Sequence, residues 1–137
     1  MKNIISIVLL ASVLNGFCQS IKNVSASEFK KQIDAYGIAV ENLVGKKAVL
    51  IDLRTPAEIK SKGKIKGAVE IDFLAKDSES IIEKLDKNKT YLIYCAGGGR
   101  SGDCAELMRK KGFKEVINLS KGFDDWKKNG FAIEIKK

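Results

Sequence analysis

The hydrophobic pattern of this chain consists of short apolar runs separated by segments with helical spacing. The runs at 48–53, 91–94 and 116–119 are typical of strands buried in a parallel sheet, and 68–71 is interpreted as another strand. Residues 131–135 are expected to add an edge strand. Strands that alternate with helices predict an α/β fold, with a central, mainly parallel sheet and helices on both faces.

Helices are expected between these runs. Ser25 to Glu28 has the S-x-x-E form of a capping box, so a helix is predicted over 26–35. Pro56 suits the first turn of a short helix. Further helices are predicted after Asp77 or Ser78, over 101–111 before Gly112, and over 123–128 before Gly130.

The N-terminal segment has the pattern of a secretory signal peptide. Lys2 precedes an apolar run over 4–14, and small residues follow at Cys18 and Ser20. The run is shorter than the about 20 residues of an ordinary membrane span, and the alternative is a retained N-terminal anchor. Phe17 stands where a bacterial lipoprotein would carry a small residue before the modified cysteine, which disfavours lipidation.

This pattern sets the expected domain organisation. Residues 1–20 are predicted to be a signal peptide, and 21–137 a single domain. The mature protein would be exported, periplasmic or extracytoplasmic, with no stable membrane span after cleavage. A monomer is expected.

Composition and charge exclude several function classes. The chain has 25 Lys and Arg against 17 Asp and Glu, a net charge of +8, but the lysines are spread in pairs, which disfavours a nucleic-acid interface. It has no histidine, which excludes histidine-based metal sites and Cys-His pairs. Three cysteines are too few for a four-cysteine zinc site, so neither a metal nor a cofactor is expected.

The candidate chemistry lies in the sequence Cys-Ala-Gly-Gly-Gly-Arg-Ser at 95–101. Cys95 ends a predicted strand, and the glycines lead into a predicted helix. Glycines allow the backbone to turn its N–H groups inward, and the helix N-terminus adds partial positive charge. Arg100 would add a full positive charge. Together these features would favour a thiolate over a free thiol, whose pKa is about 8.5.

A buried structural role is the alternative for each cysteine. For Cys95, the glycine run, Arg100 and the helix start favour a functional role. Cys104 falls on one helical face with Leu107 and Met108, so a core position is expected. A disulfide or resolving role for Cys104 is the less favoured alternative, although exported proteins often contain disulfides.

The chain resembles the rhodanese family of single-domain sulfurtransferases over nearly all of 24–135. The resemblance is carried by five motifs in order: the D-x-R-x-x-x-E of Asp52, Arg54 and Glu58, the G-x-I-x-G-A of Gly63 to Ala68, the C-x-x-G-x-R-S of Cys95 to Ser101, the Gly112-Phe113 and Asn118-Leu119 pairs, and Gly122 with Trp126. It implies a rhodanese-like fold.

The resemblance also implies thiosulfate or persulfide sulfurtransfer. Cys95 would take a sulfane sulfur from a small sulfur-containing anion or persulfide and pass it to a thiol or cyanide-like acceptor. Cys95 and Arg100 are then the expected catalytic residues. The expected substrate-binding residues are Ala96, Gly97, Gly98, Gly99 and Ser101. Asp52, Arg54 and Glu58 are expected to support the active loop, and their alternative is a set of surface ion pairs.

Two positions depart from the family pattern. Lys64 replaces the histidine of the G-H-I motif, where we expect an effect on packing or surface only. Ala96 replaces a residue that is charged in many members, which makes persulfides or a partner protein as plausible as thiosulfate.

Three other functions remain open. Four residues separate Cys95 from Arg100, and thiolate phosphatases carry one more, so a phosphatase is disfavoured. A thiol redox protein would use Cys95 with Cys104. A non-catalytic module would bind a sulfur carrier or an exported partner.

Overall fold

The computed structural model describes residues 18–39 and 45–137. The apolar run at 4–14 lies outside this part of the chain. The strands are β1 (Ser20–Val24), β2 (Ala48–Asp52), β3 (Val69–Glu70), β4 (Thr90–Tyr94) and β5 (Glu115–Leu119). The helices are α1 (Ala26–Ala35), α2 (Pro56–Lys62), α3 (Ser78–Glu83), α4 (Gly99–Lys110) and α5 (Gly122–Lys128).

The five strands form one sheet in the order β1-β5-β4-β2-β3, and all of its pairings are parallel. The central strand β4 is buried throughout, which agrees with its uninterrupted apolar run. The predicted α/β fold with a central parallel sheet is therefore confirmed.

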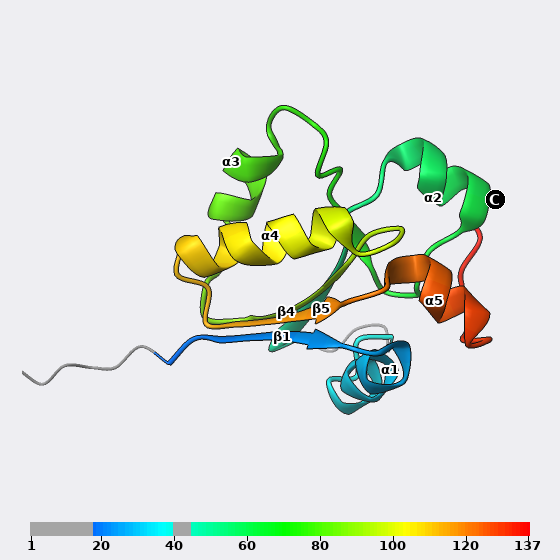
Figure 1. Cartoon of the computed structure of the whole chain (residues 1–137), viewed down its shortest axis with the longest axis horizontal. Helices are drawn as coiled ribbons and strands as arrows, with labels where there is room; N and C mark the ends of the chain where they lie inside the picture. Colours follow the sequence, from blue (N-terminus) through cyan, green and yellow to red (C-terminus); the bar gives the residue numbers. More distant parts are fainter. Residues whose placement is uncertain (1–17, 40–44) are drawn as a thin grey trace, which may run out of the picture.

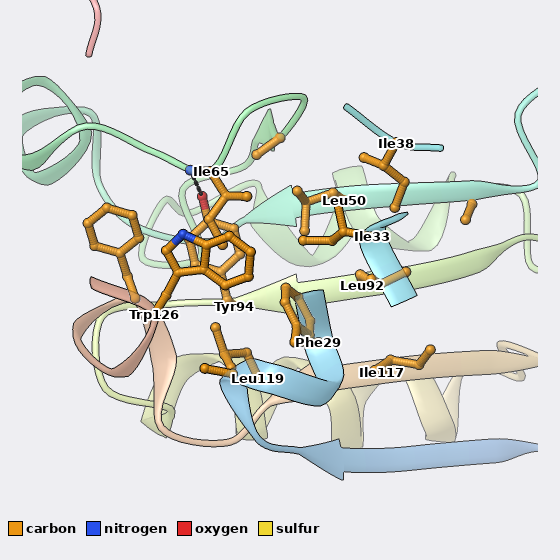
Figure 2. Close-up of a cluster of buried hydrophobic side chains, with 14 residues drawn as sticks. Phe29, Ile33, Ile38, Leu50, Ile65, Leu92, Tyr94, Ile117, Leu119 and Trp126 are labelled. Atoms are coloured by element: carbon orange, nitrogen blue, oxygen red, sulfur yellow. Dashed lines mark hydrogen bonds between the residues drawn. The ribbon is translucent and has the colours of Figure 1, made fainter. Parts of the chain in front are cut away.

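Helices cover both faces of this sheet. Figure 1 shows α4 and α3 on one face and α1 on the other. Successive β4 residues divide between the two cores: Leu92 and Tyr94 pack with α1 and α5, whereas Tyr91 and Ile93 pack with α3 and α4. Figure 2 shows the first of these clusters around Tyr94, with Phe29 and Trp126 from the covering helices.

Two strand predictions need correction. β1 was not predicted; it is an edge strand with only two apolar residues, Ile21 and Val24, and tertiary pairing with β5 defines it. The expected edge strand at 131–135 was wrong, because this segment makes only an isolated antiparallel bridge between Glu134 and Lys64. Its carbonyl at Ala132 instead accepts the Trp126 indole N–H at 3.1 Å, so packing on α5 replaces strand pairing.

Within the described ranges, no helix is long and apolar enough to cross a membrane. The strands point toward the end of the sheet where α2 and α5 lie (Figure 1). The connection from β4 to α4 lies at this end, which is where parallel α/β sheets place their ligand sites. The fold thus positions the candidate loop at the carboxyl edge of its most buried strand.

Candidate active site

Cys95 follows β4 directly, and its sulfur lies at the N-terminus of α4. The backbone N–H of Gly98 donates to Sγ at 3.1 Å, and that of Ser101 donates at 3.4 Å. The Ser101 hydroxyl oxygen lies 3.4 Å from Sγ. α4 begins without a side-chain cap, so its first N–H groups remain available to the sulfur. The predicted ring of amides therefore faces the thiol.

These contacts change the acidity of the thiol. Burial by itself would raise the pKa of Cys95, because it disfavours the charged thiolate. Hydrogen bonding of the sulfur acts in the opposite direction and outweighs burial; the partners are the Ser101 side chain and the backbone amides of Ser101, Gly98 and Gly97. The pKa of Cys95 consequently lies below its usual value, which enlarges the thiolate fraction near neutral pH.

Arg100 is bound differently from the expectation of a free positive charge. Its guanidinium donates to both carboxylate oxygens of Glu58, at 2.8 Å each, and so forms a two-pronged ion pair. Glu58 also accepts from the backbone N–H of Thr55 at 2.9 Å, as part of the capping box of α2. The charge of Arg100 is therefore matched by a carboxylate from 42 residues earlier in the chain.

Asp52 and Arg54 form a buried ion pair beside this loop. The two side chains are 0% and 1% exposed, and Arg54 Nη2 donates to Asp52 Oδ2 at 2.7 Å. Arg54 also donates to the carbonyl of Gly63, and its Cζ lies 3.9 Å from the centroid of the Phe123 ring. The alternative of a surface ion-pair set is wrong for these two residues, because both are buried and Phe123 of α5 packs against the guanidinium.

The Tyr94 hydroxyl extends this buried network to the end of β4. It donates to Asp52 Oδ2 at 2.6 Å. It also accepts from the N–H of Ile65 at 3.0 Å, the hydrogen bond drawn in Figure 2. The residue before the candidate nucleophile is therefore fixed by two hydrogen bonds. The local sequence around Tyr94 does not indicate this role, because Ile65 and Asp52 lie 29 and 42 residues away along the chain.

The N-terminal end of α5 holds the loop from the other side. The N–H of Phe123 donates to the carbonyl of Cys95 at 2.8 Å, and that of Asp124 donates to the carbonyl of Ala96 at 3.1 Å. The sequence showed Gly122 only as part of a family pattern. In the structure, this glycine allows α5 to approach closely enough to fix the two carbonyls.

Two glycines have backbone conformations that this packing requires. Gly98 has φ of 105°, and a Cβ there would overlap the carbonyl oxygen of Ser120. Gly122 has φ of 68°, and a Cβ there would overlap the carbonyl of Ala96. Gly97 and Gly99 are different: both are exposed, and a Cβ on either would meet no atom within 4 Å. The loop is thus closely packed at Gly98, where it contacts Ser120, and unobstructed at Gly97 and Gly99.

The second cysteine belongs to the core, as expected. Cys104 is 0% exposed on the inner face of α4, in the same apolar cluster as Cys95. Burial, together with the nearby Cys95, raises the pKa of Cys104 to about 12. Both thiols are free in the structure. Cys104 is therefore a poor nucleophile compared with Cys95.

Lys64 occupies the position where the family pattern has histidine. Its Nζ donates to the carbonyl of Ala68 at 3.0 Å and to Glu70 at 3.1 Å. These are packing contacts of the 63–70 segment, as expected for this departure.

Comparison with known proteins identifies the family. Residues 25–129 match the rhodanese-like domain. The chain belongs to the rhodanese-like family. A sulfurtransferase of Allochromatium vinosum is 28% identical over 102 residues, which are 74% of this chain and 92% of that protein.

Further relatives agree with this assignment. The uncharacterized protein YqhL of Bacillus subtilis is 36% identical over 92 residues, which are 67% of this chain and 68% of that protein. A rhodanese-related protein from Thermoplasma volcanium has a TM-score of 0.67 at 20% sequence identity, covering 84% of this chain and 99% of that one. This last likeness concerns the rhodanese-like fold, and the sulfurtransferase of Allochromatium vinosum supports sulfur transfer at the level of the family.

Proposed function

We propose that this protein is a sulfurtransferase that carries a sulfane sulfur as a persulfide on Cys95. The donor would be thiosulfate or a persulfide, and the acceptor a thiol or a cyanide-like nucleophile. The observation that carries this proposal is the pair of amides, from Gly98 and Ser101, that donate to Cys95 Sγ at 3.1 and 3.4 Å. They stabilise a thiolate without a histidine base.

Each transfer step balances in atoms and charge. The Cys95 thiolate attacks the sulfane sulfur of the donor; the new S–S bond forms as the donor's bond to that sulfur breaks. Thiosulfate leaves sulfite, and an alkyl persulfide leaves an alkyl thiolate. The acceptor then attacks the outer sulfur, which releases the Cys95 thiolate and gives thiocyanate or a new persulfide.

The remaining loop residues would bind the transferred sulfur. The amides of Gly98 and Ser101 donate to the sulfur of Cys95, and a Cβ on the exposed Gly97 or Gly99 would meet no atom within 4 Å. Ala96 adds no charge. Asp52 and Arg54 would keep the end of β4 fixed, while Glu58 would fix Arg100.

A mass measurement tests this proposal directly. The protein is incubated with thiosulfate or an alkyl persulfide, desalted, and its intact mass recorded. We expect a gain of one sulfur atom in the wild type and in Cys104→Ser, but none in Cys95→Ser. Thiocyanate release on addition of cyanide should follow the same pattern. Full activity in Cys95→Ser would disprove the assignment.

One observation favours a second candidate, a non-catalytic module that binds a sulfur carrier or an exported partner. Cys95 is only 1% exposed. If no sulfane donor modifies Cys95 while iodoacetamide still alkylates it, the thiol is reactive without transferring sulfur, and the binding module becomes the better explanation.

We also propose that the chain is exported, which is supported by the signal-like pattern of residues 1–20. Contacts at the start of the domain argue against cleavage directly after Ser20. The Gln19 side chain donates to the carbonyls of Arg109 and Phe113, and the N–H of Ser20 donates to Lys114. Cleavage after Ser20 would remove these contacts. N-terminal sequencing of protein from the periplasmic and cytoplasmic fractions tests both export and position.

A further inference from the structure

We propose that the Glu58–Arg100 ion pair determines the class of sulfur donor, and that it selects donors of low charge, such as persulfides, over the thiosulfate dianion. This inference rests on the sulfurtransferase function proposed above and deepens it. Glu58 acts here as a specificity-determining residue through Arg100.

The loop that carries Cys95 has little charge of its own. Residues 95–101 contain a single charged side chain, Arg100. That guanidinium is held by both oxygens of Glu58, with side-chain exposures of 22% and 30%. Pairing at this partial burial cancels most of the field that Arg100 would otherwise exert on an approaching anion.

In the part of the chain that the structure describes, the groups around the Glu58–Arg100 pair add no further positive charge near the sulfur. After Glu58, the charge of Arg100 interacts electrostatically with Cys95 and, more weakly, with Asp72, so a second carboxylate acts on the same guanidinium. The other groups facing the sulfur are uncharged amides and a hydroxyl. Once Cys95 is ionised, no uncompensated cation of the loop opposes the thiolate charge.

The possible sulfur donors differ in their negative charge. Thiosulfate carries two negative charges, and a persulfide or thiosulfonate carries one from its sulfane group. A thiolate repels the dianion about twice as strongly at equal distance. Amide donors stabilise either anion, but only a free cation would compensate the extra charge. The paired arginine therefore disfavours thiosulfate.

Two donors that differ in charge provide the test. Methanethiosulfonate resembles thiosulfate but has a methyl group in place of one charged oxygen. The measured quantity is kcat/KM for thiosulfate divided by kcat/KM for methanethiosulfonate, with cyanide as acceptor. Because each variant is compared with the wild type, the intrinsic difference in donor reactivity cancels.

The variants change the charge of the pair in known steps. Glu58→Gln frees Arg100, so we expect the ratio to rise about tenfold. Arg100→Gln leaves an unpaired carboxylate, so the ratio should fall by a similar factor. The double variant Glu58→Gln with Arg100→Gln replaces one neutral pair by another, and its ratio should return to that of the wild type.

A second readout separates charge from structural damage. Freeing Arg100 in Glu58→Gln should shift the pH profile of Cys95 alkylation by iodoacetamide to lower pH. A merely structural loss would leave the profile in place or move it to higher pH. Glu106→Gln, on the exposed side of the same helix, makes the same charge change away from the loop and should alter neither measurement.

The outcomes distinguish this inference from the proposed function. A ratio unchanged in Glu58→Gln, or a double variant as low as Arg100→Gln, would overturn the specificity assignment while sulfur transfer remained. Should Glu58→Gln fail to fold, the double variant and Arg100→Gln still decide the matter. Absence of a sulfur adduct on Cys95 with either donor would contradict the function itself.

Discussion

Gly122 lies against the carbonyl group of Ala96, and this contact joins the start of α5 to the loop that carries Cys95. Gly122 adopts a φ of 68°, and a Cβ there would overlap the carbonyl carbon and oxygen of Ala96. The next two N–H groups of the chain donate to the carbonyls of Cys95 and Ala96. The position of α5 thereby determines the shape of the loop.

Gly122→Ala should therefore damage both stability and activity. We expect a loss of about 3 kcal/mol in the free energy of unfolding, from the left-handed backbone and the overlap combined, with a large loss of sulfur transfer. Gly130→Ala is the matched control, since Gly130 has φ of 72° but open space around it. It should cost only about 1 kcal/mol and leave transfer intact. Urea unfolding and cyanide assays measure both; equal losses would contradict the close contact.

Gly102→Ala should have the opposite effect on stability. Gly102 lies inside α4 with ordinary helical geometry, and a Cβ there would meet no atom within 4 Å. Replacing glycine by alanine in a helix interior gains about 0.5–1 kcal/mol, because the unfolded chain loses freedom. A rise in the urea midpoint with unchanged transfer rates is expected, and a lower midpoint would show a contact that this geometry lacks.

Asp52→Asn should destabilise the protein strongly. The substitution leaves the buried guanidinium of Arg54 without its counter-charge, at an expected cost of about 3–5 kcal/mol. Asp34→Asn removes the exposed partner of Lys30 on α1 and should cost about 0.5 kcal/mol or less. Thermal unfolding of both variants makes the comparison, and similar small losses would mean that water screens the Asp52 pair.

The reactivity of Cys95 should depend on pH in a way that reports its surroundings. Its lowered pKa predicts that alkylation by iodoacetamide reaches half its maximal rate at a lower pH than alkylation of an unperturbed, solvent-exposed cysteine. Ser101→Ala removes the hydroxyl that lies 3.4 Å from the sulfur and that helps to lower the pKa of Cys95, so the midpoint should move to higher pH. Cys104→Ser should leave the midpoint nearly unchanged, because the Cys104 thiol is neutral in this range. A midpoint that Ser101→Ala does not move would contradict the hydrogen bond.

Acid should weaken the protein partly through Glu58. Its hydrogen bonds from Arg100, ahead of those from Thr55, lower the pKa of Glu58 from 4.5 to about 2. A lowered carboxyl pKa stabilises the folded state fully above the unfolded value of 4.5, and this contribution disappears as pH falls toward 2. Between those values the urea midpoint of the wild type should fall more steeply than that of Glu58→Gln. Parallel curves would show that the pair contributes nothing.

The sequence predicted much of the fold because local patterns carried it. The run at 91–94 is apolar at every position, which is typical of a strand covered on both faces of a parallel sheet, so the predicted strand lies close to the observed bounds of β4. β1 was not predicted and the strand at 131–135 was predicted wrongly, because both segments have weak hydrophobic patterns. Their conformation depends on which partner each one meets, β5 for the first and Trp126 for the second.

Part of the candidate site could likewise be predicted from local sequence, and part could not. Cys95, the glycines and the helix start are contiguous, so their chemistry could be inferred from their order alone. The sequence also indicated Glu58 and Arg100, but not that they bind each other. Their pairing requires the turn after β2 and the turn after β4 to meet at one edge of the sheet.

The sequence by itself thus determined the strand core, the family motifs and the thiol with its surrounding amides, because each depends on neighbours within a few residues. Only the tertiary structure decided the charge around that thiol and the support of its loop. Arg100 meets Glu58, and Ala96 meets Gly122, through contacts between distant segments. Such contacts form only when parallel strands bring their carboxyl ends together, and a local sequence pattern does not specify which distant segments meet there.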